Sequence, residues 1–245
     1  VVVRTSSEKV QKDTFEFTYK GQTLKYEVAN GNEAKVSKQQ SAKISGDVKI
    51  PERVKFAGKK YTVTSIGKFA FEYCKGLTSV TIPNSVTSIE GFAFSHCYRL
   101  TSIIIPNSVT SIGGFAFSRC SGLTSVIIPN SVTTIETGSF KDCFHLTSVT
   151  IPNSVTAIGD VAFYFCYSLT SVTIPNSVTA IDEAAFEECT GLTSVTIPNS
   201  VTTIGKSAFA SCKGLTNVTI GNSVTTIGKY AFNLCRNLKN INVST

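Results

Sequence analysis

The sequence predicts a β-rich solenoid, a stack of similar coils rather than one globular core. Cysteines recur every 23 residues, at positions 74, 97, 120, 143, 166, 189, 212 and 235. The frame around them reads LTSVTIPNSVTSIEGFAFSHC from Leu77 to Cys97. A strict period is typical of proteins in which each coil buries its apolar side only against its neighbours. We therefore expect one elongated domain, and we expect its function to lie in the deviations between coils.

A strand with one buried face follows each cysteine. We number the coils by their cysteine, from coil one with Cys74 to coil eight with Cys235, and assign to each coil the strand after its cysteine. Leucine stands three residues after every cysteine, and β-branched apolar residues follow at two alternate positions, as in Val80 and Ile82. Such alternation predicts a strand, and the stacked coils predict a parallel sheet on one face. Proline or Gly221 then ends the strand and turns the chain.

A second, shorter arm is predicted on the opposite side of each coil. After the turn, segments of the type NSVTSI supply another apolar pair, such as Val86 and Ile89. These segments indicate a short strand or a 3-10 segment. A phenylalanine three residues before each cysteine then gives a stacked aromatic core. The predicted stack runs through Phe71, Phe94, Phe117, Phe140, Phe163, Phe186, Phe209 and Phe232.

The N-terminal segment, residues 1–46, does not follow the period and is predicted to be a cap, with the solenoid occupying 47–245. Alternating apolar residues on both sides of a Lys-Gly-Gln-Thr turn predict a β-hairpin over 14–28. The segment DVKIP at 47–51 echoes the repeat frame, and a nine-residue insertion in coil one suggests a second hairpin around its AGKK segment. A solenoid exposes its core at its ends, so a charged, atypical segment suits a cap.

Composition and charge exclude several classes of protein. Most of the net charge of +7 comes from residues 1–60, which hold 13 Lys and Arg against 7 Asp and Glu, whereas residues 61–245 hold 10 against 9 and are nearly neutral. We therefore expect no nucleic-acid binding, which needs a basic face along the repeats. No apolar run approaches the roughly 20 residues that span a bilayer. The chain has no Met, which favours a mature secreted protein or a trimmed chain.

The eight cysteines are predicted to be buried free thiols. Equivalent positions in neighbouring coils stack at about 4.8 Å with parallel side chains, whereas a disulfide needs converging Cβ atoms about 3.8 Å apart. No CxxC motif or nearby Cys/His pair suggests a metal site, and we expect no cofactor. Catalysis is not expected either, because His96 and His145 fall at different positions of coils two and four and lack a fixed partner.

The repeat, read from Leu123 to Cys143 or from Leu192 to Cys212, resembles the BspA-like leucine-rich repeat proteins, and the resemblance covers nearly all of residues 47–245. The hairpin followed by GDVKIP and YTVTSIGKFAF also resembles the start of such surface proteins. The resemblance implies a curved, right-handed solenoid on secreted or surface-anchored proteins of host-associated bacteria and some protozoa. It implies adhesion to host matrix proteins such as fibronectin or fibrinogen, an extracellular or cell-surface location, and no catalytic residues.

Deviations from the frame select the candidate ligand-binding residues. Ile104 and Ile127 replace the usual Thr on the solvent face of the strands of coils two and three, as two exposed apolar side chains in register. The residue after each cysteine is aromatic in coils two, four and five, and aromatic or basic residues lie nearby. Tyr and Arg are common in protein-binding hot spots, although some rings could instead pack on the core. The remaining candidates are Tyr98, Arg99, Phe144, His145, Tyr164 and Tyr167.

The leading hypothesis is a non-enzymatic binding module, monomeric, that holds a protein ligand on the strand face and rim of coils one to five. A structural spacer that displays another domain is the second hypothesis, in which the variation between coils is neutral. Glycan recognition is the third, because aromatic rims can stack on sugars.

Overall fold

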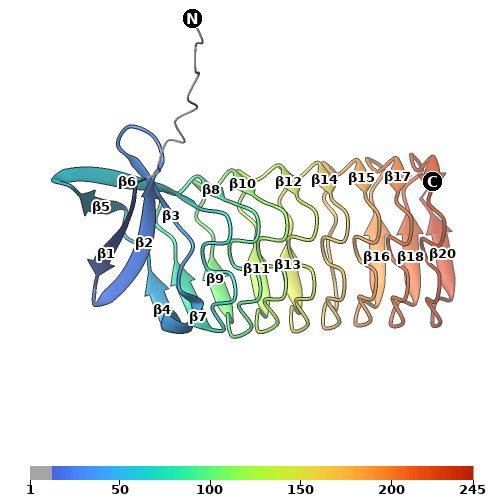
Figure 1. Cartoon of the computed structure of the whole chain (residues 1–245). Helices are drawn as coiled ribbons and strands as arrows, with labels where there is room; N and C mark the ends of the chain where they lie inside the picture. The colour runs from blue at the N-terminus through green and yellow to red at the C-terminus, as the bar shows by residue number, and fades with distance from the viewer. Residues whose placement is uncertain (1–12, 245) are drawn as a thin grey trace, which may run out of the picture.

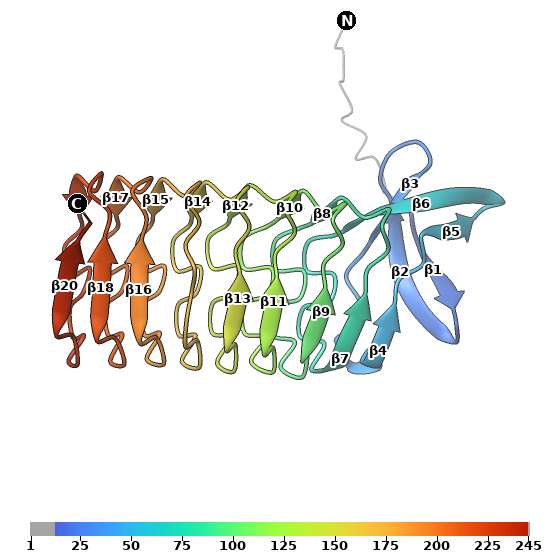
Figure 2. The ribbon, with the colours of Figure 1, turned by 180° about the vertical axis from the view of Figure 1, so that it is seen from behind.

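The computed structural model describes residues 13–244 and shows an elongated stack of coils with a β-rich cap at its N-terminal end (Figure 1). The long strands lie in a row on one face of the stack and the shorter strands in a second row (Figure 2). The predicted β-solenoid, with parallel sheets and almost no helix, is therefore confirmed.

The cap begins with the predicted hairpin. Strand β1 (Thr14–Tyr19) pairs antiparallel with β2 (Gln22–Val28) through a two-residue turn, in which Lys20 and Gly21 both have positive φ. This conformation matches the twist of the two strands and favours glycine. Strand β2 pairs with β3 (Glu33–Val36), and β3 pairs parallel with β6 of coil one. The cap sheet is thus continuous with the sheet of short arms.

The insertion in coil one forms the second predicted hairpin. After a short 3-10 turn, η1 (Ser41–Lys43), and β4 (Ser45–Lys49), strand β5 (Arg53–Phe56) pairs antiparallel with β6 (Lys59–Ile66). The rings of Phe15, Tyr26, Phe56 and Tyr61 cluster where this hairpin meets the cap, with Phe15 and Phe56 stacked at 4.6 Å between centroids. The aromatic cluster joins the cap to the first coil.

The long strands form a parallel sheet in three pieces. The pieces are β4-β7-β9, β11-β13 and β16-β18-β20, in register from coil to coil except for a shift between Gly46 and Asp47 where β4 pairs with β7. In coil five, residues 171–174 form no regular strand, and the amide of Thr170 donates to the carbonyl of Thr147 at a long 3.4 Å. The strands are β7 (Gly76–Thr81), β9 (Ser102–Ile104), β11 (Ser125–Ile127), β13 (Ser148–Thr150), β16 (Ser194–Ile197), β18 (Asn217–Ile220) and β20 (Asn240–Val243).

The opposite arm of each coil is a two-residue strand, in agreement with the prediction. These short strands pair parallel in two sheets, one continuous with β6 and one running from coil four to coil eight. They are β8 (Ser88–Ile89), β10 (Ser111–Ile112), β12 (Thr134–Ile135), β14 (Ala157–Ile158), β15 (Ala180–Ile181), β17 (Thr203–Ile204) and β19 (Thr226–Ile227).

The core consists of stacked rows of identical side chains. The leucines that follow the cysteines are fully buried from Leu77 to Leu215. The row of core phenylalanines from Phe71 to Phe232 is stacked coil on coil, with centroids 5.2–5.5 Å apart and nearly parallel planes. This spacing lies within the favourable range for ring pairs. Each coil therefore provides the template on which the next one packs.

All eight cysteines are free and buried, as predicted. From coil two onward each thiol also donates a hydrogen bond to the carbonyl of the core phenylalanine in the preceding coil, as Cys97 does to Phe71 at 3.1 Å. Burial raises the pKa of the Cys74 thiol to about 12, and the thiols of coils three to six are shifted in the same direction. The thiols of coils three to six are thus protonated donors that join adjacent coils.

Each coil turns back towards its long strand through two residues in the left-handed region of φ. One stands five residues before the cysteine and the other directly before it, and only Gly138 among them is a glycine. Hydrogen bonds to the next coil hold these turns: the amide of His96 donates to Ser118 at 2.8 Å, and that of Arg119 to Lys141 at 2.7 Å. Because left-handed backbone is costly for residues with a Cβ, the stacking of coils must impose it.

Candidate functional site

The residues next to the cysteines form an edge along the start of the sheet, which we call the aromatic rim. Directly after the cysteine, coils two, four and five carry the rings of Tyr98, Phe144 and Tyr167, whereas coils six to eight carry Thr190, Lys213 and Arg236. The left-handed residue before the cysteine reaches the same edge in coils two and five, where His96 contacts Tyr98 and Phe165 contacts Tyr167. The rim consists of Tyr73, His96, Tyr98, Arg99, Arg119, Phe144, His145, Tyr164, Phe165 and Tyr167.

Four rings form one cluster in coils four and five. Phe144 and Tyr167 stack with centroids 5.5 Å apart, and Phe165 contacts both Tyr167, at 5.3 Å, and Tyr164, at 4.2 Å. The ammonium of Lys141 lies 5.0 Å from the ring of Tyr164. Phe144 and Tyr167 remain 38% and 39% exposed, so they pack on each other at the surface rather than within the core.

The tyrosines of this cluster are hydrogen-bond donors at neutral pH. Burial raises the pKa of the Tyr164 hydroxyl, and the carboxylates of Glu187 and Glu188 raise it further. The pKa of Tyr167 is raised in the same way by burial and by Glu188. A surface of exposed rings with protonated phenols buries a large area and bonds directionally, as protein-binding hot spots do.

A second cluster lies in coils one and two. His96 stacks on Tyr73 at 4.2 Å and meets Tyr98 edge to face at 5.8 Å. The ammonium of Lys75 lies 5.9 Å from the ring of Tyr98, which is 37% exposed. The rings of Tyr73 and Tyr98 both lie outside the buried core. Of the predicted residues, Tyr98 therefore joins a cluster separate from that of Phe144, Tyr164 and Tyr167.

His96 connects the second cluster to a charge pair. Its Nδ1 lies 2.8 Å from the hydroxyl of Ser95, and its Nε2 lies 3.3 Å from a guanidinium nitrogen of Arg119. Arg119 in turn donates to the nearly buried carboxylate of Asp142 at 3.2 Å. Since the guanidinium can only donate, Nε2 accepts its hydrogen bond, and the ring is neutral. Burial and the charge of Arg119 lower the pKa of His96 below its ordinary value.

His96 should make stability depend on pH below neutrality. Because its folded pKa is lower than its unfolded one, the unfolded chain binds the proton first as pH falls. We therefore expect unfolding free energy to be lost as pH falls through the ordinary histidine range near 6.5 towards the lower folded pKa. Thermal melts between pH 7.5 and 5.5 should show a steeper decline for the wild type than for His96→Asn. Equal declines for the two chains would contradict this role.

His145 and Arg99 lie on the rim beside the two clusters. The Nδ1 of His145 lies 2.6 Å from the carbonyl oxygen of Ser121, so this nitrogen must donate a hydrogen bond to that oxygen. The Nε2 of the exposed side chain is the other ring nitrogen that can bind a partner. Arg99 is exposed next to Tyr98. Both side chains stand where coils two to four present their rings, as the sequence predicted, although neither is part of a ring cluster.

Ile104 and Ile127 lie apart from the rim, at the far end of their strands. They are 80% and 69% exposed on the solvent face of β9 and β11 in adjacent coils. Equivalent positions in the coils on either side are Thr81 and Thr150, also exposed. The candidate residues therefore divide between the rim and an isolated apolar pair on the sheet face.

Sequence reasoning missed a further row of surface rings. Phe69, Phe92 and Phe115, five residues before successive cysteines, stack at 5.2 and 5.0 Å and are half-buried. The row begins beneath the ammonium groups of Lys38 and Lys68 and ends on Gly138, where a Cβ would lie 2.3 Å from the ring of Phe115. Three consecutive phenylalanines at one frame position were the available signal. The ring faces at both ends of this row are already covered.

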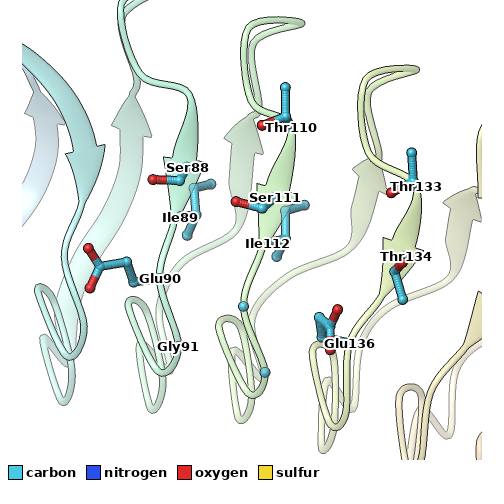
Figure 3. Close-up of a pocket in the computed structure, with 12 residues that line it drawn as sticks. Ser88, Ile89, Glu90, Gly91, Thr110, Ser111, Ile112, Thr133, Thr134 and Glu136 are labelled. Atoms are coloured by element: carbon cyan, nitrogen blue, oxygen red, sulfur yellow. The ribbon is translucent and has the colours of Figure 1, made fainter.

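A groove crosses the short arms of coils two to four (Figure 3). Its volume is about 380 Å³, and Gly91, Gly113 and Gly114 are among the residues that line it. Figure 3 shows Glu90 and Glu136 on either side of the coil with Ser111. Glu90 accepts a hydrogen bond from the amide of Lys68 at 2.8 Å and so ties two coils together.

The described residues contain neither a cluster of metal ligands nor a helix that could span a membrane. Within 13–244, no group of three or more His, Cys, Asp or Glu side chains is arranged to hold a metal ion. The same part of the chain contains no helix with the length and apolar character of a membrane span.

Comparisons with known proteins agree with the repeat architecture. Residues 52–169 and 156–245 match the family model described as BspA type leucine rich repeat region, in six copies. The fold is similar to that of a T. pallidum leucine rich repeat protein, with 25% identity, a TM-score of 0.68, and coverage of 89% of this chain and 88% of the other. Comparison with curated protein sequences finds no match.

Two further solved structures are similar. A leucine-rich repeat protein from Bacteroides ovatus shares 28% identity and a TM-score of 0.58, over 94% of this chain and 70% of the other. A leucine-rich repeat protein from Eubacterium ventriosum shares 29% identity and a TM-score of 0.65, over 76% of this chain and 47% of the other. These similarities concern the fold and the repeat.

Proposed function

The chain belongs to the BspA-type leucine-rich repeat family, and we propose that it is a non-enzymatic binding module of a secreted or cell-surface protein. In this proposal the aromatic rim and the adjacent sheet face of coils one to five hold a protein ligand. Leucine-rich repeats offer a long, stiff surface on which exposed positions vary while the core stays fixed, which suits recognition of another macromolecule.

The observation that carries the proposal is the gathering of exposed rings on one edge. The frame places small or charged residues after the cysteine in coils six to eight, yet places rings in coils two, four and five. Tyr98, Phe144 and Tyr167 are each more than one third exposed, so the core does not account for them. Exposed aromatic side chains together with arginine are the composition of binding hot spots. Matrix proteins such as fibronectin and fibrinogen are the ligands we propose to test first.

Changing Tyr98, Phe144 and Tyr167 together to alanine should abolish binding and leave the fold intact. The three rings are partly exposed and pack on other surface side chains, so their removal should cost much less than the loss of a core ring. Surface plasmon resonance on immobilised fibronectin and fibrinogen at physiological salt, with thermal unfolding in parallel, measures both effects. We expect saturable binding by the wild type and none by the variant.

The other outcomes of this experiment discriminate between functions. A variant that binds as well as the wild type would place the ligand elsewhere on the solenoid. A wild type that binds neither matrix protein but retains a glycan in an array would favour glycan recognition. A wild type that binds nothing in either assay would favour a structural spacer.

The exposed isoleucines allow a milder test of the sheet face. Replacing Ile104 and Ile127 by threonine restores the residue that neighbouring coils carry, so the unfolding free energy should change by less than about 0.5 kcal/mol each. If the ligand extends over the sheet, its dissociation constant should rise severalfold, since two apolar contacts are lost. An unchanged dissociation constant would limit the interface to the rim.

A further inference from the structure

One position in the rim lacks the ring that its neighbours have. Directly after the cysteine stand Tyr98 in coil two, Ser121 in coil three, Phe144 in coil four and Tyr167 in coil five. Phe144 and Tyr167 show that rings at this position stack across adjacent coils, with centroids 5.5 Å apart and planes inclined by 20°. The serine of coil three therefore interrupts a ladder of rings that is otherwise in register.

In the described chain, the ring and cation contacts of Tyr98 and Phe144 come from coils one, two and five, and none comes from coil three. The ammonium of Lys75 in coil one lies against Tyr98, and Tyr167 in coil five lies against Phe144. Tyr98 also meets His96 of its own coil edge to face. Within residues 13–244, no ring or cation of coil three contacts Tyr98 or Phe144. Two coil spacings separate the positions of Tyr98 and Phe144, roughly 10 Å. A ring inserted midway would lie about 5 Å from each, within the favourable stacking range.

The floor of this gap is fixed. The carbonyl of Ser121 accepts a hydrogen bond from His145 at 2.6 Å, which ties coil three to coil four. The Ser121 hydroxyl lies 3.5 Å from the carbonyl of Tyr98 and so turns back towards coil two. Gly122 follows, and a Cβ there would lie 2.8 Å from the same carbonyl. The frame position between the two rings therefore carries small residues, Ser121 and Gly122, on a closely packed backbone.

Exposed charges around the gap are mainly positive. Arg99 lies beside Tyr98 and is exposed, and the side chain of Arg119 is 53% exposed two residues before Ser121. The carboxylate that contacts these basic groups, Asp142, is 6% exposed and is paired with Arg119. Arginine would repel a cationic side chain that sought the same rings and would attract carboxylates next to an aromatic one.

We propose that the gap at Ser121 is a slot for one aromatic side chain of the protein ligand, flanked in that ligand by acidic residues. The ligand's ring completes the ladder between Tyr98 and Phe144, and its carboxylates pair with Arg99 and Arg119. This inference rests on the proposed function, since it names the chemistry that the rim recognises.

A tryptophan peptide tests the slot directly, because the chain itself contains no tryptophan. The probe is a heptapeptide with one central tryptophan and two glutamates on each side, excited at a wavelength that only indole absorbs. The slot should bind it saturably with a shift in indole emission. Peptides with alanine in place of tryptophan, used as competitors, should bind at least about tenfold more weakly, because two ring contacts are lost.

Substitutions at Ser121 and at the equivalent position of coil six provide matched variants for this test. Ser121→Phe places a ring in the gap and should weaken peptide binding about tenfold or more, while raising the melting temperature by completing the ladder. Thr190→Phe adds a ring at the same frame position of coil six, on the side of Tyr167 that faces away from Phe144. It should raise the melting temperature similarly without weakening peptide binding. Ser121→Ala keeps the gap open and should bind as the wild type does.

Two results would overturn the slot. One is a Ser121→Phe chain that remains folded and binds the peptide as tightly as the Thr190→Phe chain. The other is a wild type that binds fibronectin or fibrinogen through the rim, yet neither binds the peptide nor loses matrix binding on Ser121→Phe. The second result would leave the proposed function standing, so the two proposals fail separately.

Discussion

Replacing Phe163 by alanine should destabilise the chain by about 3–5 kcal/mol, the usual range for a buried ring removed from a core. Phe163 is fully buried and stacked between Phe140, at 5.5 Å, and Phe186, at 5.2 Å. Its loss leaves a cavity at the centre of the stack and removes two ring contacts. Because each coil packs only on its neighbours, the defect interrupts the contact between the two halves of the solenoid. Urea unfolding followed by circular dichroism measures the change in free energy.

The same substitution at the end of the stack gives the control. Phe232 occupies the equivalent position in coil eight but is only half-buried, and it contacts one ring, Phe209, at 5.4 Å. Phe232→Ala should therefore cost less than half as much as Phe163→Ala. Equal losses of unfolding free energy at the two positions would mean that a ring stacked on both sides stabilises the chain no more than a ring stacked on one side. That result would contradict the view that stacking between coils stabilises the fold.

The core and the strands could be predicted from the sequence because the same pattern of apolar and polar residues occurs eight times along the chain. A single LTSVTIP segment is ambiguous, but its recurrence at a fixed interval identifies Leu, Val and Ile as one face. Both hairpins were also predictable, since a turn signal separates alternating residues in each case. Cysteine was correctly identified as a buried free thiol. Its hydrogen bond to a phenylalanine carbonyl of the preceding coil was not foreseen, because that contact depends on where the turn places the carbonyl.

The left-handed turns could not be predicted in the same way. Positive φ is usually signalled by glycine, yet the positions before the cysteines hold residues such as Tyr73, Arg119 and Phe165. Hydrogen bonds from the neighbouring coil determine the backbone there, and such contacts between coils carry no local sequence signal. The consequence reaches the site, because side chains on these residues join the rim.

The candidate site was predicted as a list of residues rather than as an arrangement. Deviation from the frame selected Tyr98, Phe144 and Tyr167 at one frame position, and the two of them in adjacent coils, Phe144 and Tyr167, stack. It could not show that Phe165 joins Tyr164 to Tyr167, or that His96 links a ring cluster to Arg119, because those contacts depend on side-chain directions at the turns. The gap at Ser121 becomes visible only when the ring spacing of its neighbours is known.

Coil eight leaves apolar side chains without a covering coil in the described chain. Ile227, Leu234, Ile241 and Val243 are 52%, 50%, 54% and 65% exposed, whereas residues at the same frame positions as Ile227 and Ile241 in coil seven are buried. The long strand β20 pairs with β18 on one side only. A further coil stacked on this surface would bury these side chains in the way that coil eight buries those of coil seven.

Appending a copy of residues 199–221 directly after Ser244 should therefore stabilise the chain. Ser244 holds the frame position of Gly221, so the copy continues the register. Burying the four half-exposed side chains of coil eight favours the longer chain by about 1 kcal/mol each, so its melting temperature should be higher than that of the original chain. The control carries serine in place of the leucine, phenylalanine and isoleucines of the copy, and should show no gain. An equal rise in both chains would mean that the added length, rather than burial of the end of coil eight, stabilises the solenoid.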